Sequence, residues 1–130
     1  MIVLDENILD GQRLLLEASR VAVKQIGVDY GRKGMTDGEI IVLLRGHRNL
    51  TFFTRDADFY QPHLRHARYC LVVMNVGQNE AASFVRRFLR HTNFNTQLKR
   101  MGNVVLLSHV ALSFWNPRSQ SETRQVWERS

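Results

Sequence analysis

The 130-residue sequence is poor in cysteine and proline and has no long hydrophobic run. Its one cysteine, Cys70, cannot form an internal disulfide, and its place in the apolar run YCLVVMNV favours a small core residue. No apolar segment approaches the roughly 20 residues of a membrane span, and the start MIVLDEN does not resemble a signal peptide. We therefore expect one globular domain over residues 1–116 with a polar tail over 117–130, a cytoplasmic location and no membrane partner.

Acidic residues are nearly missing from the middle of the chain. Residues 61–100 contain seven lysines and arginines against Glu80 alone, whereas residues 1–60 contain eight against nine acids. The formal net charge is +6 and the sequence pI is about 10.2. Such a charge favours a polyanionic partner, nucleic acid before a membrane. The alternative is that the basic block only solvates one helix face.

Apolar segments alternate with amphipathic ones, which predicts an α/β fold. Thr36 followed by Glu39 is a capping-box pattern, Asp10 is the expected N-cap of the first helix, and Trp127 could dock the tail. The expected strands are residues 1–4, 21–28, 50–54, 69–76 and 103–115, the last with a hairpin break near Ser108 and His109 as an alternative. The expected helices are residues 11–20, 36–49 and 79–92.

This alternation favours right-handed crossovers and a three-layer fold around a mostly parallel sheet of four to five strands. Ligand sites in such sheets lie at the carboxyl ends of the strands. With a strand order of 2-1-3-4, Asp5 and Asp56 converge at one end of the sheet. The Thr54 hydroxyl shares a strand face with Asp56 and could support it there, although Thr54 also suits a strand as a β-branched residue.

Six acids fall at two strand ends and one helix start. They are Asp5, Glu6, Asp37, Glu39, Asp56 and Asp58. Carboxylates held together repel one another, and a divalent cation removes this cost. Ligation by oxygen alone suits Mg²⁺ or Mn²⁺ rather than zinc. A metal held in this way can activate water and stabilise the charge that develops on a phosphodiester.

Four of these acids also have a structural interpretation. Glu39 can complete the capping box, and Asp37 can stabilise the first turn of its helix. Glu6 can point away from Asp5 because neighbouring strand residues alternate, and Asp58 can cap the turn DADFY. A purely structural role is least expected for Asp5 and Asp56, because each ends a buried strand.

Three motifs, IVLDEN, TDGEII and LTFFTRDADF, occur in order within residues 1–107. Their sequence and spacing resemble the short PIN-like proteins, a compact branch of the PIN-domain nucleases that includes VapC-like toxins. The chain departs from that pattern where ILDGQ replaces a proline that often follows Asp-Glu-Asn, and where YQPHLRHARY is unusually basic.

The resemblance implies a PIN-like fold and a metal-dependent endoribonuclease, the toxin component of a toxin–antitoxin pair. Carried over residue by residue, it implies catalytic roles for Asp5, Asp37, Asp56 and Asp58 with support from Thr54. The same four aspartates, with Glu39, would hold Mg²⁺ or Mn²⁺. The implied partners are an RNA substrate, a cognate antitoxin protein and a second copy in a homodimer.

The basic residues supply the candidates for binding the RNA backbone. These are Arg55, Arg65, Arg68, Arg86, Arg87 and Arg90. Two other functions stay open. The first is a non-catalytic RNA- or partner-binding module that keeps the fold. The second is a phosphoacceptor receiver domain, which also places acids after its first and third strands but needs a lysine where Ser108 and His109 stand.

Overall fold

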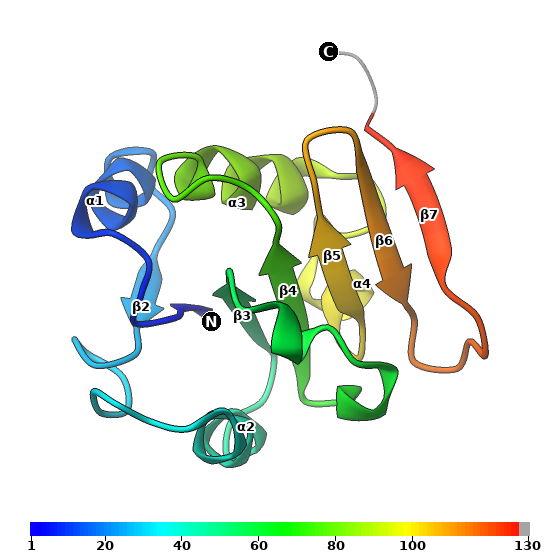
Figure 1. Cartoon of the computed structure of the whole chain (residues 1–130), viewed down its shortest axis with the longest axis horizontal. Coiled ribbons are helices and arrows are strands. Elements are labelled where there is room, and N and C mark those ends of the chain that lie inside the picture. The colour runs from blue at the N-terminus through cyan, green and yellow to red at the C-terminus, as the bar shows by residue number, and fades with distance from the viewer. Residues whose placement is uncertain (128–130) are drawn as a thin grey trace.

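The computed structural model describes residues 1–127. Its strands are β1 (Ile2–Leu4), β2 (Val23–Gln25), β3 (Leu50–Thr54), β4 (Tyr69–Met74), β5 (Val104–Leu107), β6 (Ala111–Trp115) and β7 (Thr123–Val126) (Figure 1). Its helices are α1 (Asp10–Ala18), α2 (Asp37–Arg45), α3 (Ala81–Arg90) and α4 (Gln97–Arg100), with short 3₁₀ helices η1 (Ala57–Phe59) and η2 (Pro62–Leu64). The last three residues of the predicted tail lie outside the described residues.

The seven strands form one sheet in the order β2-β1-β3-β4-β5-β6-β7. The first five strands of this order pair in parallel, whereas β6 and β7 pair antiparallel. The predicted α/β class and the 2-1-3-4 order are confirmed. The prediction of a mostly parallel sheet of four to five strands needs correction, because the chain after β5 turns back twice and makes a mixed sheet of seven.

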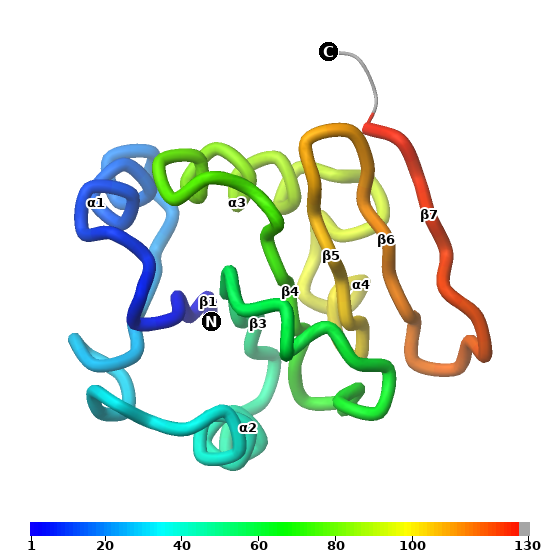
Figure 2. Tube along the Cα trace, viewed as in Figure 1, coloured from blue at the N-terminus to red at the C-terminus, as the bar shows by residue number. Residues whose placement is uncertain are grey.

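Helices cover both faces of the sheet, as the apolar pattern of its central strands requires. Leu4 and Phe53 belong to the core beneath α1 and α3, whereas Val3 and Phe52 belong to the core beneath α2. Figure 2 shows α1 and α3 together on one side and α2 on the other. Cys70 is fully buried, and this burial raises the pKa of its thiol, in agreement with a core residue.

The helix starts differ in how well the sequence predicted them. The Thr36 side chain accepts a hydrogen bond from the Glu39 N–H, and the Glu39 carboxylate accepts one from the Thr36 N–H, so the capping box is confirmed. Asp10 is not the N-cap of α1, because the helix begins one residue earlier than predicted and Leu9 takes that position. Asp10 lies instead in the first turn, where its negative charge still favours the helix dipole.

The polar segment after β6 packs on the domain through residue 127. It contributes β7, and the Trp127 indole N–H donates a 2.7 Å hydrogen bond to the Ser108 carbonyl. Arg65 holds the preceding turn through bonds of 2.8 and 2.7 Å to the carbonyls of Asn116 and Ser119. The break predicted near Ser108 is the turn between β5 and β6. Within residues 1–127, no helix has both the length and the apolar character needed to cross a membrane.

Candidate metal centre

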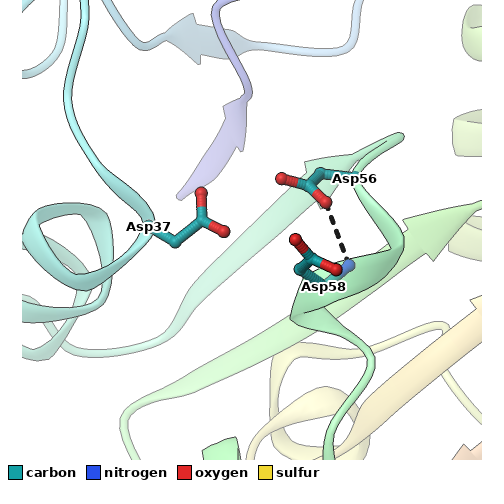
Figure 3. A group of neighbouring side chains, drawn as sticks. All are labelled: Asp37, Asp56 and Asp58. Carbon is teal, nitrogen blue, oxygen red and sulfur yellow. Dashed lines mark hydrogen bonds between the residues drawn. The ribbon is translucent and has the colours of Figure 1, made fainter.

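Four aspartates gather where β1 and β3 end and α2 begins. Asp5 directly follows β1, Asp56 and Asp58 follow β3, and Asp37 is the first residue of α2. Because β1 and β3 are parallel neighbours, their carboxyl ends lie at the same end of the sheet. Figure 3 shows the carboxylates of Asp37, Asp56 and Asp58 directed toward a common space. We call these three residues the acidic group.

The acidic group has the spacing of a metal site. One carboxylate oxygen from each of Asp37, Asp56 and Asp58 lies within 4.8 Å of the others, and all three side chains are exposed. Among residues 1–127, no lysine, arginine or histidine forms an ion pair with them. Desolvation, and then repulsion from the neighbouring aspartates, raises the pKa of Asp37 above its ordinary value. The three charges are therefore held together without a cationic side chain between them.

Asp5 is the buried neighbour of the acidic group, with 8% of its surface exposed. Its Oδ2 accepts a 2.6 Å hydrogen bond from the Thr54 hydroxyl, and its Oδ1 accepts a 2.8 Å bond from the Glu6 N–H. The pKa of Asp5 is raised, chiefly by burial and also by repulsion from Asp56 and Glu6, although the bonds from Thr54 and Glu6 act to lower it. The Thr54 oxygen also accepts a 3.0 Å bond from the Asp56 N–H, so it connects the two strand ends.

The motif TRDADF builds the turn that carries Asp56 and Asp58. The Asp56 carboxylate caps η1 by accepting a 2.9 Å hydrogen bond from the Asp58 N–H. This reverses the expectation that Asp58 caps the turn. Phe59 is buried and packs edge-on against Phe52 with ring centroids 5.5 Å apart. The turn is thus fixed to the core on one side and presents two carboxylates on the other.

Glu39 and Glu6 are held away from the acidic group. The Glu39 carboxylate is occupied by the Thr36 N–H and by an ion pair with Arg32, and the bonds to Thr36 lower its pKa. Glu6 accepts a 2.9 Å hydrogen bond from the Gly34 N–H. The structure therefore gives Glu39 its capping role and does not place it among the candidate ligands.

A cavity of about 270 Å³ adjoins the acidic group. Asp5, Asn7, Ile8, Arg55 and Asp56 line it. The Arg55 Nε donates a 2.9 Å hydrogen bond to the Val76 carbonyl, so the guanidinium is anchored to the segment that follows β4, and its residue lines the same cavity as Asp5 and Asp56. The sequence interpretation did not assign Asn7 to the site, although its position at the end of DEN was a usable signal.

The other five predicted RNA-binding arginines do not line this cavity. Arg65 donates to carbonyls of the β6–β7 connection, and Arg86 donates to the serine that follows α1. Arg87 lies over the Trp127 ring, 4.3 Å from its centroid. Arg90 is exposed on α3, and Arg68 precedes β4 at the opposite end of the sheet. Arg55 is the one member of this set that the structure brings to the acids.

The fold and the site together define an α/β protein with clustered carboxylates at the carboxyl ends of its parallel strands. Comparison of the chain with models of protein families, with curated proteins and with solved structures finds no match. The resemblance to the PIN-like proteins therefore stays a prediction, carried by the three sequence motifs.

Proposed function

We propose that this protein is a metal-dependent endoribonuclease of the PIN-like type. The observation that carries the proposal is the convergence of Asp37, Asp56 and Asp58 within 4.8 Å at a place where α/β sheets bind ligands. The basic character of the chain supports an RNA substrate. The three sequence motifs support the reaction class.

The donor set fits Mg²⁺ or Mn²⁺. Hard divalent cations prefer carboxylate oxygens and retain several waters, and the acidic group is exposed enough to leave room for them. Asp37, Asp56 and Asp58 would hold the ion, with Asp5 beside them. A bound ion would supply an activated water at neutral pH and offset the charge that develops on the phosphodiester.

The chain's own residues have separate tasks in this proposal. Thr54 fixes the Asp5 carboxylate and the backbone of Asp56, so the ligands keep their positions when substrate enters. Arg55 lines the cavity next to the acidic group and would contact a phosphate oxygen of the substrate. Asn7 lines the same cavity and offers an amide to a ribose or a phosphate.

The biological setting is proposed from the resemblance alone. It is the toxin component of a toxin–antitoxin system, with a cognate antitoxin protein as partner and a homodimer as its assembly. The RNA substrate is proposed from both the resemblance and the net charge of +6.

Cleavage of a mixed single-stranded RNA pool by purified protein tests the proposal. The reactions contain Mn²⁺, Mg²⁺ or EDTA, and they compare wild type with Asp56→Asn and with Glu17→Gln, an exposed acid on α1. We expect cleavage that needs metal, falls at least about a hundredfold in Asp56→Asn and is unchanged in Glu17→Gln. RNA binding without cleavage by wild type in either metal would favour the non-catalytic binding module.

A further inference from the structure

A second charged surface lies at the amino end of the sheet, where β3 and β4 begin. Arg45 is the last residue of α2, Arg48 lies in the connection to β3, and Arg68 directly precedes β4. The Arg68 guanidinium donates a 3.3 Å hydrogen bond to the Arg45 carbonyl, and the Leu50 N–H donates one of 3.3 Å to the Arg68 carbonyl. The first contact joins Arg68 to Arg45, and Arg48 follows Arg45 by three residues. We call these three exposed arginines the amino-end patch.

The amino-end patch has no acidic counterpart in the segments that build it. Residues 40–55 and 59–79 contain no aspartate or glutamate. None of the ion pairs found in residues 1–127 includes an arginine of the patch. Like charges held close together cost folding free energy, and a bound anion would offset this cost.

Two histidines flank the patch and add flat, polar side chains to it. His66 stacks on Tyr69, with ring centroids 5.3 Å apart and planes 21° apart. His47 directly precedes Arg48 and contacts the ring of Tyr30 at 5.2 Å. Arginines interleaved with ring side chains are the combination that binds single-stranded nucleic acid, through phosphate contacts and base stacking.

We propose that the amino-end patch binds the phosphate backbone of single-stranded RNA, at a place separate from the acidic group. The guanidinium fork matches two phosphate oxygens, and three such groups at one end of the sheet can meet successive phosphates of a polyanion. The patch and Asp56 lie at opposite ends of the five-residue strand β3, roughly 17 Å apart at 3.3–3.4 Å per residue. Binding at the patch needs no metal, so it does not rest on the proposed catalytic function.

Fluorescence anisotropy with a labelled 20-nucleotide uridine RNA tests this proposal. The measurements use the full chain in EDTA across a series of NaCl concentrations. The patch variant is Arg45→Gln/Arg48→Gln/Arg68→Gln. The matched control, Lys24→Gln/Lys33→Gln/Arg124→Gln, removes the same three charges from exposed positions elsewhere.

We expect the patch variant to bind RNA at least about tenfold more weakly than the control at 0.1 M salt. The slope of log K against log salt should fall by about 2, since each single-strand phosphate contact contributes about 0.7. The triple Arg→Lys variant of the patch keeps the charges but loses the bidentate fork, so its affinity for RNA should fall between those of wild type and the glutamine variant. If the glutamine variant loses its thermal unfolding transition, Arg48→Glu alone replaces it and should still weaken binding several-fold.

Three results would overturn the proposal. One is equal weakening by the patch and control variants, which would mean that RNA responds only to net charge. Another is the absence of RNA binding by wild type in EDTA at low salt. The third is a patch variant that binds RNA as wild type does but no longer binds a labelled poly-glutamate peptide, which would assign the patch to an acidic protein. None of these depends on whether the protein cleaves RNA.

Discussion

The Thr54 hydroxyl donates a 2.6 Å hydrogen bond to the Asp5 carboxylate, across the parallel pair of β1 and β3. The same oxygen accepts a bond from the backbone N–H of Asp56. Both partners in the first bond are buried, and the Thr54 side chain is fully so. One hydroxyl therefore holds the ends of two strands in register beside the acidic group.

Replacing Thr54 with valine should destabilise the protein by about 1–3 kcal/mol, because the shape is kept while the buried Asp5 carboxylate loses its donor. Urea unfolding at pH 7 in EDTA measures this change. Thr54→Ser keeps the hydroxyl and should recover most of the loss. A valine variant as stable as wild type would mean that the bond contributes nothing to the positions of β1 and β3.

The Asp37 carboxyl should titrate above its ordinary pKa of 3.8, because desolvation and three neighbouring aspartates disfavour its charge. A folded-state pKa above the unfolded value means that ionisation of Asp37 lowers stability. This loss begins as the pH rises through the unfolded pKa and is complete above the folded one. NMR titration of the side-chain carboxyl carbon measures the shift.

In Asp56→Asn the Asp37 pKa should move back toward 3.8, since one of the repelling charges is gone. Saturating Mg²⁺ should lower it in wild type, because a nearby cation favours the carboxylate. An Asp37 pKa at or below 3.8 in metal-free wild type would contradict the electrostatics described for the acidic group.

Glu39→Ala should leave metal binding intact, because the structure assigns Glu39 to the capping box and not to the acidic group. Thermal unfolding with and without Mn²⁺ separates the two roles. At 100 times its dissociation constant, Mn²⁺ should add about 2.7 kcal/mol to the stability of wild type and of Glu39→Ala. The starting melting temperature of Glu39→Ala should be lower, since α2 loses half of its cap.

Asp58→Asn provides the contrast. It should lose the stabilisation by Mn²⁺, because a ligand is gone, and keep the capping box of α2 intact. If Glu39→Ala loses the shift and Asp58→Asn keeps it, the ligand assignment is wrong in both places.

Arg65→Ala should destabilise the domain by about 2 kcal/mol or more, because its guanidinium donates to two carbonyls in the β6–β7 connection. RNA cleavage and Mn²⁺ binding should change little at temperatures where the variant stays folded. Arg90→Ala, on the exposed side of α3, should cost less than about 0.5 kcal/mol. If Arg65→Ala and Arg90→Ala lower the free energy of unfolding equally, the bonds of Arg65 do not stabilise the domain.

Local signals predicted the parallel half of the fold well. The bounds of β3 were predicted as observed, since LTFFT is an apolar run that begins after a turn and ends at a charged residue. The start of α2 was predictable because the capping-box pattern of Thr36 and Glu39 is local in the sequence. Strand β7 was missed because TRQV is polar, and only its pairing with β6 makes it a strand.

The candidate site was predictable in its aspartates and not in its arginines. Asp5 and Asp56 follow strands whose adjacency could be inferred, so their convergence could be inferred as well. The partner of an arginine depends on tertiary packing. The sequence therefore carried no sign that Arg65 bonds to carbonyls of the β6–β7 connection or that Arg87 lies over a tryptophan ring. The reversed cap at Asp56 depends on the backbone of a short 3₁₀ turn, which residue types alone do not fix.

If Asp37, Asp56 and Asp58 form one divalent metal centre, the protein should bind Mn²⁺ through these three carboxylates. The amplitude of the free Mn²⁺ signal in electron paramagnetic resonance, during titration with protein, measures bound metal. We expect at least one Mn²⁺ bound per wild-type chain. Binding should be at least tenfold weaker in each of Asp37→Asn, Asp56→Asn and Asp58→Asn, and unchanged in Glu17→Gln. Wild type that leaves all Mn²⁺ free at millimolar concentrations, or three variants that bind as wild type does, would contradict this assignment of the metal centre.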